Sequence, residues 1–395
     1  MTADDPIVIV GFARTAIGGF QGVFSRKPAP VLGTAAISAT LERGGLAAKA
    51  VDEVVFGCVL PAGQGQAPAR QAAIGAGIPY STGATTVNKM CGSGMKAVMI
   101  AHDLIVAGSA ARVVAGGMES MTNAPYLLDR ARGGYRLGHG RVIDHMFLDG
   151  LEDAYDKERL MGTFAEDCAE AYQFTREMQD SYALTSVTRA RKAGENGVFD
   201  AEITPVTITN GKSEQLVCAD EQPGKARPEK IPTLKPVFRD GGTVTPANSS
   251  SIADGAAALL LMRRSDALQR GLKPLATIRG HSTHAQAPSR FTTAPIGALN
   301  KLSQKTGWAL KDVDLFEINE AFAVVTMAAM RELDLPHDKV NIHGGACALG
   351  HPIGASGARI IVTLLAALEH HQLKRGMAAI CIGGGEATAM ALERI

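Results

Sequence analysis

Internal similarity between the two ends of the chain is the feature that most constrains its fold. "PIVIVGFART" from Pro6 has a counterpart in "PLATIRGHST" from Pro274, and "VDEVVFG" from Val51 matches "VDLFEIN" from Val313. The run that begins "GSGMKAVMIAHDLIVAG" at Gly92 parallels the run that begins "GASGARIIVTLLAALEH" at Gly354. These pairs are separated by roughly 262 to 268 positions and keep the same order. The sequence therefore predicts two related halves that face each other across a pseudo-twofold axis.

Each half alternates strand-like and helix-like segments. Two of the predicted strands, "RVVAGG" and "AAICIGGG", are almost entirely apolar, which is typical of strands covered on both faces of a sheet. We therefore expect an α/β protein with a layered α-β-α-β-α core.

The segment between the halves has a different composition, with more charge, proline and turn residues. It predicts an inserted loop domain at 121–248. The first half then comprises 1–120 plus 249–272, and the second half comprises 273–395. Within the insertion, 166–194 has helical character, with acidic residues early and basic residues late.

Composition excludes several classes of function. The 395 residues are 46% hydrophobic and 20% charged, with a formal net charge of +1, so no overall field attracts nucleic acid or an anionic membrane. The N-terminus lacks the pattern of a signal peptide, and no apolar run approaches the roughly 18 residues of a membrane span. We expect a cytoplasmic protein.

The six cysteines are scattered and form no CxxC pair, so neither a disulfide framework nor a zinc ribbon is indicated. His343, Cys347 and His351 are spaced by four and would line one face of a helix as metal ligands. The surrounding glycines and Pro352 oppose a helix there, so we expect no metal site.

The stretch "MCGSGMKA" from Met90 supports three interpretations. As GxGxxA it is similar to a dinucleotide fingerprint, but the nearest acidic candidate, Glu119, lies 27 residues after Gly92 rather than about 20. Cys91 at the start of a helix is alternatively a nucleophile, whose pKa the helix N-terminus lowers. A buried cysteine in a packing turn is the third interpretation.

The second half offers partners for such a nucleophile. Asn319 and Glu320 follow a predicted strand, and His351 lies on a loop just before the segment that mirrors the Cys91 helix. Cys381 ends a buried strand and is followed by Gly383, whose backbone is exposed to a ligand. We expect these groups to converge.

The sequence resembles the thiolase family, in particular its acetyl-CoA acetyltransferase type, over essentially the whole chain. The resemblance is carried by four motifs in order: Cys91-Gly92-Ser93, Asn319-Glu320-Ala321-Phe322, Gly350-His351-Pro352 and Cys381-Ile382-Gly383. It implies the duplicated five-layer thiolase fold with its loop domain. It also implies reversible CoA-dependent cleavage of 3-ketoacyl-CoA and Claisen condensation of acetyl-CoA through an acyl-cysteine.

The resemblance assigns a role to each catalytic residue. Cys91 is the nucleophile, and His351 takes its proton and then binds the thioester oxygen of the second acyl-CoA beside a water held by Asn319. Cys381 exchanges a proton with the C2 carbon of acetyl-CoA. The backbone N–H groups of Cys91 and Gly383 form the oxyanion site. Coenzyme A is a substrate, and neither a tightly bound cofactor nor a metal is implied.

The resemblance also predicts substrate contacts and assembly. Ser250 matches a contact to pantetheine, and the matching apolar residues of the pocket are Leu151, Met161, Phe238, Ala321 and Phe322. Lys225, Arg227 and Lys230 are candidates for the phosphates, or alternatively a solvated charged loop. Family members are homo-oligomers, and we expect a tetramer built as a dimer of dimers, with no nucleic-acid or membrane partner.

Two departures from the short-chain pattern, Leu160 and Phe291, leave other activities open. One is a longer-chain 3-ketoacyl-CoA thiolase of fatty-acid degradation. Another is a ketoacyl synthase-like condensing enzyme, which would lack the second cysteine in a CxG turn. A nucleotide-binding module and a non-catalytic CoA carrier are the remaining alternatives.

Overall fold

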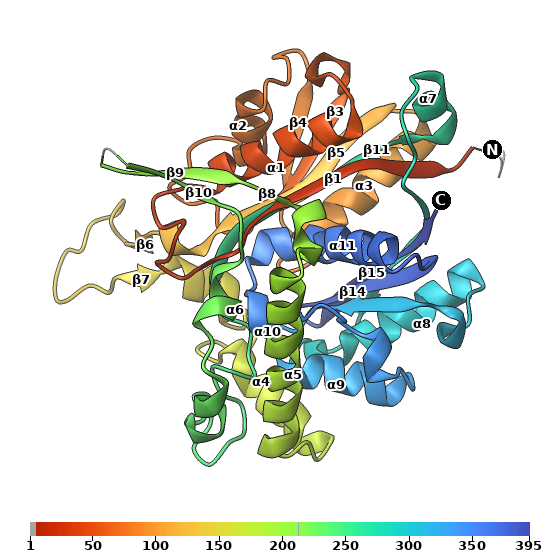
Figure 1. The fold of residues 1–395 in the computed structure, drawn as a ribbon. Helices are drawn as coiled ribbons and strands as arrows, with labels where there is room; N and C mark the ends of the chain where they lie inside the picture. The colour runs from red at the N-terminus through yellow and green to blue at the C-terminus, as the bar shows by residue number, and fades with distance from the viewer. Residues whose placement is uncertain (1–4, 212) are drawn as a thin grey trace.

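The computed structural model describes residues 5–211 and 213–395 and is built around one sheet of 11 strands (Figure 1). Nine strands follow one another in the order β13-β14-β15-β12-β1-β11-β5-β3-β4, while β2 pairs with β11 and β8 pairs with β1. Their bounds are β1 Ile7–Thr15, β2 Gly18–Gly19, β3 Glu53–Gly57, β4 Gly83–Val87, β5 Arg112–Ser120, β8 Ile203–Thr204, β11 Ala253–Arg263, β12 Ala276–Ala285, β13 Leu315–Ile318, β14 Arg375–Ile382 and β15 Glu386–Arg394.

The strand order is symmetric about the junction of β1 and β12. Moving outward from it, β11, β5 and β3 on one side correspond to β15, β14 and β13 on the other. Among the described residues, the strand pairing between β1 and β12 consists of Val8–Thr277 and Ile9–Ala276, which joins the two halves of the sheet. The predicted duplication is therefore visible in the pairing of the strands, and β4 is the one strand of this path without a counterpart.

Helices form three layers around the two half-sheets, as the sequence predicted. In Figure 1, α1 and α2 lie at the top, α11 lies in the middle, and α8 and α9 lie at the bottom. Both α3 and α11 contact strands of both halves, so they form the central layer. The helices are α1 Ala29–Gly44, α2 Pro68–Gly75, α3 Ser93–Ala107, α4 Met161–Ala171, α5 Arg176–Glu195, α6 Glu221–Lys225, α7 Arg264–Gln269, α8 Ala294–Thr306, α9 Ala323–Glu332, α10 Ala346–Leu349 and α11 Ile353–His370.

The strands are apolar on both faces because each face meets a different layer of helices. Along β11, Ala258 and Leu260 pack toward α1, whereas Leu259 and Leu261 pack toward α3 and α11. This alternation follows from the two-residue period of a strand. A strand buried in this way needs no polar face, which explains the continuous apolar runs of the sequence.

The central helices correct one expectation about hydropathy. Among the described residues, Met90–Ala107 and Ile353–His370 are long and apolar enough to cross a membrane by length and composition. The second segment is 89% buried inside the fold and the first is 50% buried. Their apolar character is therefore accounted for by packing between the half-sheets.

Glycines let the two central helices touch near their N-termini. A Cβ atom at Gly94 of α3 would lie 2.7 Å from the backbone nitrogen of Ala358, and one at Gly357 of α11 would lie 2.5 Å from that of Met95. Gly94 corresponds to Gly357 in the repeat, and Met95 corresponds to Ala358. The contact is thus reciprocal and marks the pseudo-twofold axis.

The intervening segment carries two small hairpins and several helices. β6 Tyr126–Leu127 pairs with β7 Ile143–Asp144, and β9 Val206–Asn210 pairs with β10 Ser213–Val217. The region 166–194, expected to be helical, is divided between α4 and α5. The break contains Gln173 at φ 54° and the buried Phe174, and Thr175 caps α5 by accepting a hydrogen bond from the Met178 N–H.

Candidate active site

Cys91 lies in a constrained turn between β4 and α3. Met90, directly before it, has φ 47°, a left-handed conformation that bulky residues rarely adopt. The Ser93 hydroxyl holds the turn, because it accepts the Lys89 N–H at 2.8 Å and donates to the Met90 carbonyl at 2.6 Å. At Gly92 a Cβ atom would lie 2.4 Å from the Ile382 side chain. The turn of Cys91 therefore fits directly against the strand that carries Cys381.

Burial, rather than the helix N-terminus, sets the protonation state of Cys91. Burial raises the pKa of its thiol to about 11, although hydrogen bonds from the backbone N–H groups of Gly383 and of Cys91 itself oppose this shift. The prediction of a lowered pKa is wrong for the unliganded site. The thiol is protonated at neutral pH, so a nearby base must take its proton before it can attack.

His351 is the predicted candidate for such a base. It follows Gly350, which has φ 106° and leaves no room for a side chain, since a Cβ there would lie 2.8 Å from that of Ala253. Its Nδ1 lies 2.6 Å from the Ser356 hydroxyl, which itself donates to the Pro352 carbonyl at 3.0 Å. We assign the ring proton to Nδ1, because the hydroxyl then accepts one hydrogen bond and donates the other.

The other ring nitrogen of His351, Nε2, is buried and has no hydrogen-bond partner in the protein. Burial, with a further contribution from the positive charge of Arg359, lowers the pKa of His351 to about 3. The imidazole is therefore neutral at physiological pH. Its free lone pair is available to a proton from a substrate or a thiol.

Asn319 has a second buried nitrogen atom without a hydrogen-bond partner. Its side chain is buried at the end of β13, and its Oδ1 accepts a long hydrogen bond of 3.4 Å from Arg359. Arg359 also donates to Glu317 at 3.5 Å. The Nδ2 of Asn319 has no partner. A buried, unpartnered amide donor is costly unless a ligand or water meets it, so it marks a binding position.

Cys381 lies at the carboxyl end of β14 and is 1% exposed. Burial raises the pKa of its thiol well above the usual value, and the neighbouring Cys91 raises it further. The two cysteines are therefore coupled electrostatically. Gly384 and Gly385 turn the chain into β15 with φ 92° and 88°. The turn places the Gly383 N–H at the Cys91 sulfur.

The predicted pocket residues form two apolar groups around these thiols. One buried cluster includes Cys381 together with Met161, Phe238, Phe291, Ala321 and Phe322. Leu151 packs in another cluster with Met90, Cys91 and Ile353. The backbone N–H of Ser250 donates to the Ala321 carbonyl at 2.9 Å, which fixes Ser250 beside the first cluster.

The candidate phosphate contacts are not brought to this site by any side-chain interaction that the described residues make. Lys225, Arg227 and Lys230 are all exposed. The ammonium group of Lys225 pairs with Glu221 of the same short helix, α6, at 2.5 Å. Their position therefore agrees equally with the alternative of a solvated charged loop.

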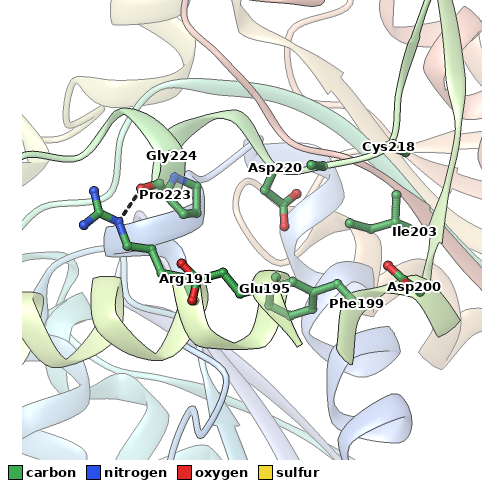
Figure 2. Close-up of a pocket in the computed structure, with 12 residues that line it drawn as sticks. Arg191, Glu195, Phe199, Asp200, Ile203, Cys218, Asp220, Pro223 and Gly224 are labelled. Atoms are coloured by element: carbon green, nitrogen blue, oxygen red, sulfur yellow. Dashed lines mark hydrogen bonds between the residues drawn. The ribbon is translucent and has the colours of Figure 1, made fainter. Parts of the chain in front are cut away.

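A cavity of about 540 Å³ lies elsewhere, between α5 and the segment that leads into α6 (Figure 2). Arg191 donates to the Pro223 carbonyl at 2.8 Å on one side, and Cys218 and Ile203 lie on the other. No residue predicted as catalytic lines this cavity. It is therefore separate from the thiols.

Glu119 has a structural position that the sequence did not reveal. Its fully buried carboxylate accepts backbone N–H groups from Val59, Leu60 and Gly354 at 2.9, 3.2 and 2.9 Å. Burial raises its pKa to about 7. Because these contacts join the first half to the start of α11, Glu119 is not available to a ribose, and this argues against the dinucleotide interpretation. The only sequence signal is an acidic residue at the end of an apolar strand.

The three residues considered above as possible metal ligands, His343, Cys347 and His351, do not come together in the structure. The Nε2 of His343 lies 3.0 Å from that of His371, whereas the Cys347 N–H donates to Glu320 and His351 contacts Ser356. Glu320 also accepts hydrogen bonds from Tyr182, Ser186 and Asn341. It therefore anchors surrounding elements.

Two electrostatically coupled thiols beside backbone N–H donors, together with a neutral imidazole on the loop before α11, are the groups of a thiol-dependent acyltransferase. The chain matches the models of the thiolase N-terminal domain over residues 7–265 and the thiolase C-terminal domain over residues 272–394. It belongs to the thiolase family.

Its similarity to individual proteins extends over the whole chain. It is 51% identical over 390 residues to acetyl-CoA acetyltransferase 2 of Arabidopsis thaliana, which covers 98% of this chain and 96% of the relative. It is 50% identical over 393 residues to the cytosolic acetyl-CoA acetyltransferase of Mus musculus, covering 99% and 98%. The crystal structure of the Bacillus anthracis acetyl-CoA acetyltransferase superposes with a TM-score of 0.96 at 40% identity and covers 99% of each chain.

Proposed function

We propose that this chain is an acetyl-CoA C-acetyltransferase that joins two acetyl-CoA molecules, or cleaves a 3-ketoacyl-CoA with CoA, through an acyl-cysteine. The observation that carries the proposal is the position of the Gly383 N–H at the sulfur of Cys91, with the Cys381 thiol coupled to it. The names of the full-length relatives support the same activity.

In the first step, the Nε2 of His351 takes the proton of Cys91, and the sulfur attacks the thioester carbon of acetyl-CoA. The negative charge on the carbonyl oxygen is stabilised by the N–H groups of Cys91 and Gly383, a type of contact worth about 3 to 4 kcal/mol per donor. The C–S bond to CoA then breaks, and the departing sulfur takes the proton of Cys381. Acetyl-Cys91, protonated His351 and a Cys381 thiolate remain.

In the second step, the Cys381 thiolate removes a proton from C2 of another acetyl-CoA. The enolate oxygen is stabilised by His351 and by a water held at the free Nδ2 of Asn319. The C2 carbon attacks acetyl-Cys91, and the Cys91 sulfur leaves and recovers its proton from His351. Protons balance over the cycle, and neither a tightly bound cofactor nor a metal takes part in these steps.

The substrate pocket in this proposal combines Ser250 near pantetheine with the apolar residues around the thiols, namely Leu151, Met161, Phe238, Ala321 and Phe322. Phe291 packs edge-to-face against Phe164 in the same cluster, with ring centroids 6.1 Å apart. Because Phe291 and Leu160 differ from the short-chain pattern, longer acyl chains are the second candidate substrates. Lys225, Arg227 and Lys230 remain candidates for the phosphates.

The proposal includes a homo-oligomer, a tetramer formed as a dimer of dimers, located in the cytoplasm. The mouse and rat relatives are named cytosolic. The sheet ends at β4, whose alternate residues are exposed, and such an unpaired edge is a ready pairing surface. The proposed division into 1–120 plus 249–272, 121–248 and 273–395 is supported by the position of β11 between β1 and β5.

The test measures the two half-reactions separately. Cys91→Ala should abolish labelling by acetyl-CoA and all turnover. Cys381→Ala should still be acetylated on Cys91, more slowly because it no longer protonates the departing CoA sulfur, but should lose condensation by about a thousandfold or more, because removal of a catalytic group that acts on carbon has effects of this order. A panel of 3-ketoacyl-CoA substrates of increasing chain length, followed with free CoA, reports the preferred length.

Each alternative has its own result in this test. Condensation that survives in Cys381→Ala and uses an acyl-carrier protein would favour a ketoacyl synthase. Binding of NAD without any reaction on acyl-CoA would favour a nucleotide-binding module. Tight CoA binding with no acetylation of Cys91 would indicate a carrier, and the enzyme proposal would then be wrong.

A further inference from the structure

Three potential metal ligands meet on the surface, away from the thiols. His102 and Asp103 belong to α3, and His281 belongs to β12 of the other half. The Oδ1 of Asp103 lies 3.0 Å from the Nδ1 of His102 and 3.0 Å from the Nε2 of His281. One ligand atom from each residue lies within 4.8 Å of the others. Elements separated by 178 positions thus bring two imidazoles and a carboxylate to one point.

We propose that His102, Asp103 and His281 bind a divalent transition-metal ion of the zinc class. Two imidazole nitrogens and one carboxylate oxygen are a ligand set that zinc accepts, with water in a fourth position. Zinc–ligand distances of about 2.0 to 2.2 Å place tetrahedral ligands roughly 3.3 Å apart. The two 3.0 Å separations need a small expansion for an ion to replace the hydrogen bonds, and the remaining pair of ligand atoms, which lies within 4.8 Å, must close to the same distance.

The surroundings leave the site both organised and accessible. The side chains of His102 and His281 are 19% and 12% exposed, and that of Asp103 is 59% exposed. The two rings pack edge-to-face with centroids 5.1 Å apart, which fixes their orientation. Asp103 leaves a path from solvent to the ligand atoms.

The charges near the site limit its affinity for a metal ion. With both imidazoles neutral, the three ligands carry one negative charge. Lys305, from α8, donates to the His281 carbonyl at 3.1 Å and adds a nearby positive charge. We therefore expect an accessory site that links α3 to β12, rather than one required for folding. Binding should stabilise the folded protein in proportion to occupancy.

This site could not be predicted from the sequence, because its ligands have no metal-binding spacing. The inference does not depend on the proposed enzymatic activity. Its test therefore uses binding readouts alone.

The experiment titrates tag-free, full-length protein with Zn²⁺ by calorimetry and with Co²⁺ by absorption spectroscopy. Cys218, which is exposed, is replaced by serine throughout so that its thiol does not compete. We expect one ion per chain, with affinity reduced at least tenfold in Asp103→Asn and in His281→Gln. The matched controls are His139→Gln, at an exposed histidine, and His371→Gln, in the other histidine group. Both should bind like the parent.

A variant that gains an absorption band on binding cobalt tests the site even if other variants fail to fold. Asp103→Cys, at an exposed position, should bind Co²⁺ under reducing conditions and add a sulfur-to-cobalt charge-transfer band. Unchanged zinc binding in Asp103→Asn, the absence of that band, or loss of binding only in His371→Gln would each overturn the proposal.

Discussion

The unpartnered nitrogens of His351 and Asn319 are each oriented by one side chain behind them. Ser356 binds the far nitrogen of the imidazole, and Arg359 binds the oxygen of the amide. Arg359 is only 2% exposed and also donates to the Glu317 carboxyl group. Because Arg359 offers only donors, it determines which end of the Asn319 amide faces the pocket. It is thus a positioning residue.

We predict that Arg359→Met lowers kcat for condensation by about tenfold to a hundredfold, since misplacement of a catalytic group by about 1 Å has an effect of this order. KM for acetyl-CoA should change little, and the rate of Cys91 acetylation should not fall, because Asn319 acts only in the second step and loss of the Arg359 charge removes one cause of the lowered pKa of His351, the base of the first step. Burst kinetics and steady-state assays measure both. Arg359→Lys, which keeps the charge, should recover part of the loss, and equal loss in both half-reactions would contradict the prediction.

A second prediction at this scale concerns acid stability. Burial, followed by the nearby His371 and His370, lowers the pKa of His343 from 6.5 to about 4. Since the unfolded chain binds the proton first, this histidine contributes stability that is complete above pH 6.5 and is lost as the pH falls toward 4. The slope is at most about 1.4 kcal/mol per pH unit.

His343→Gln should therefore flatten the dependence of unfolding free energy on pH between 6.5 and 4, as measured by urea denaturation. His139→Gln, at an exposed site, should leave the slope unchanged. The slope of the variant must be compared with that of the parent, because other buried groups also change stability over this pH range. Burial raises the pKa of Glu119 to about 7 and that of Glu317 to about 8, so these two carboxyl groups favour the folded protein as the pH falls, opposite to His343. An unaltered slope in His343→Gln would contradict the prediction.

Individual residues were predictable where the chemistry is local to a motif. Flanking glycines predict the turns that carry Cys91 and Cys381 and the loop that carries His351. The partners of Glu119 and Arg359 could not be predicted, because they depend on segments brought together by the fold. The direction of the Cys91 pKa shift was also missed, since burial depends on the whole environment and here outweighs the helix terminus.

At the scale of elements, the contact between α3 and α11 brings corresponding glycines of the two halves against each other. We predict that Gly357→Ala separates these helices and destabilises the protein by about 1 to 3 kcal/mol, the usual cost of overpacking. It should also lower turnover, because α11 begins two residues after His351. Thermal unfolding and kcat measure these effects.

Gly194→Ala is the matched control for that substitution. Gly194 lies in α5, and a Cβ atom there would meet nothing within 4 Å. The control should be neutral or stabilising by about 0.5 to 1 kcal/mol, since alanine favours a helix. A similar response at both positions would show that the interhelical contact is not tight.

The order and type of elements followed well from the sequence because the repeated halves constrain each other. The break between α4 and α5, however, could not be predicted from the sequence. The segment 166–194 has no proline to signal an interruption, and the break depends on the burial of Phe174 within a distant cluster. Short local patterns do not report such contacts.

At the scale of the whole molecule, the exposed edge of β4 is the surface that the fold leaves open. We predict that Thr85→Lys, at an exposed position of this strand, weakens the proposed oligomer while the subunit stays folded, because charge at a strand edge opposes pairing. Light scattering after size-exclusion chromatography measures the mass. Thr207→Lys, exposed on β9, should have no effect, and an unchanged mass in Thr85→Lys would place the interface elsewhere.

The reciprocal glycine contact has a mechanical consequence. When two bodies rock about a common axis, points near that axis move least. Cys91 is three positions before Gly94, and His351 is six before Gly357, so both groups of the proposed acyl transfer lie close to this contact along the chain. Thermal rocking of one half against the other would therefore displace the outer helices far more than it alters the gap between sulfur and imidazole.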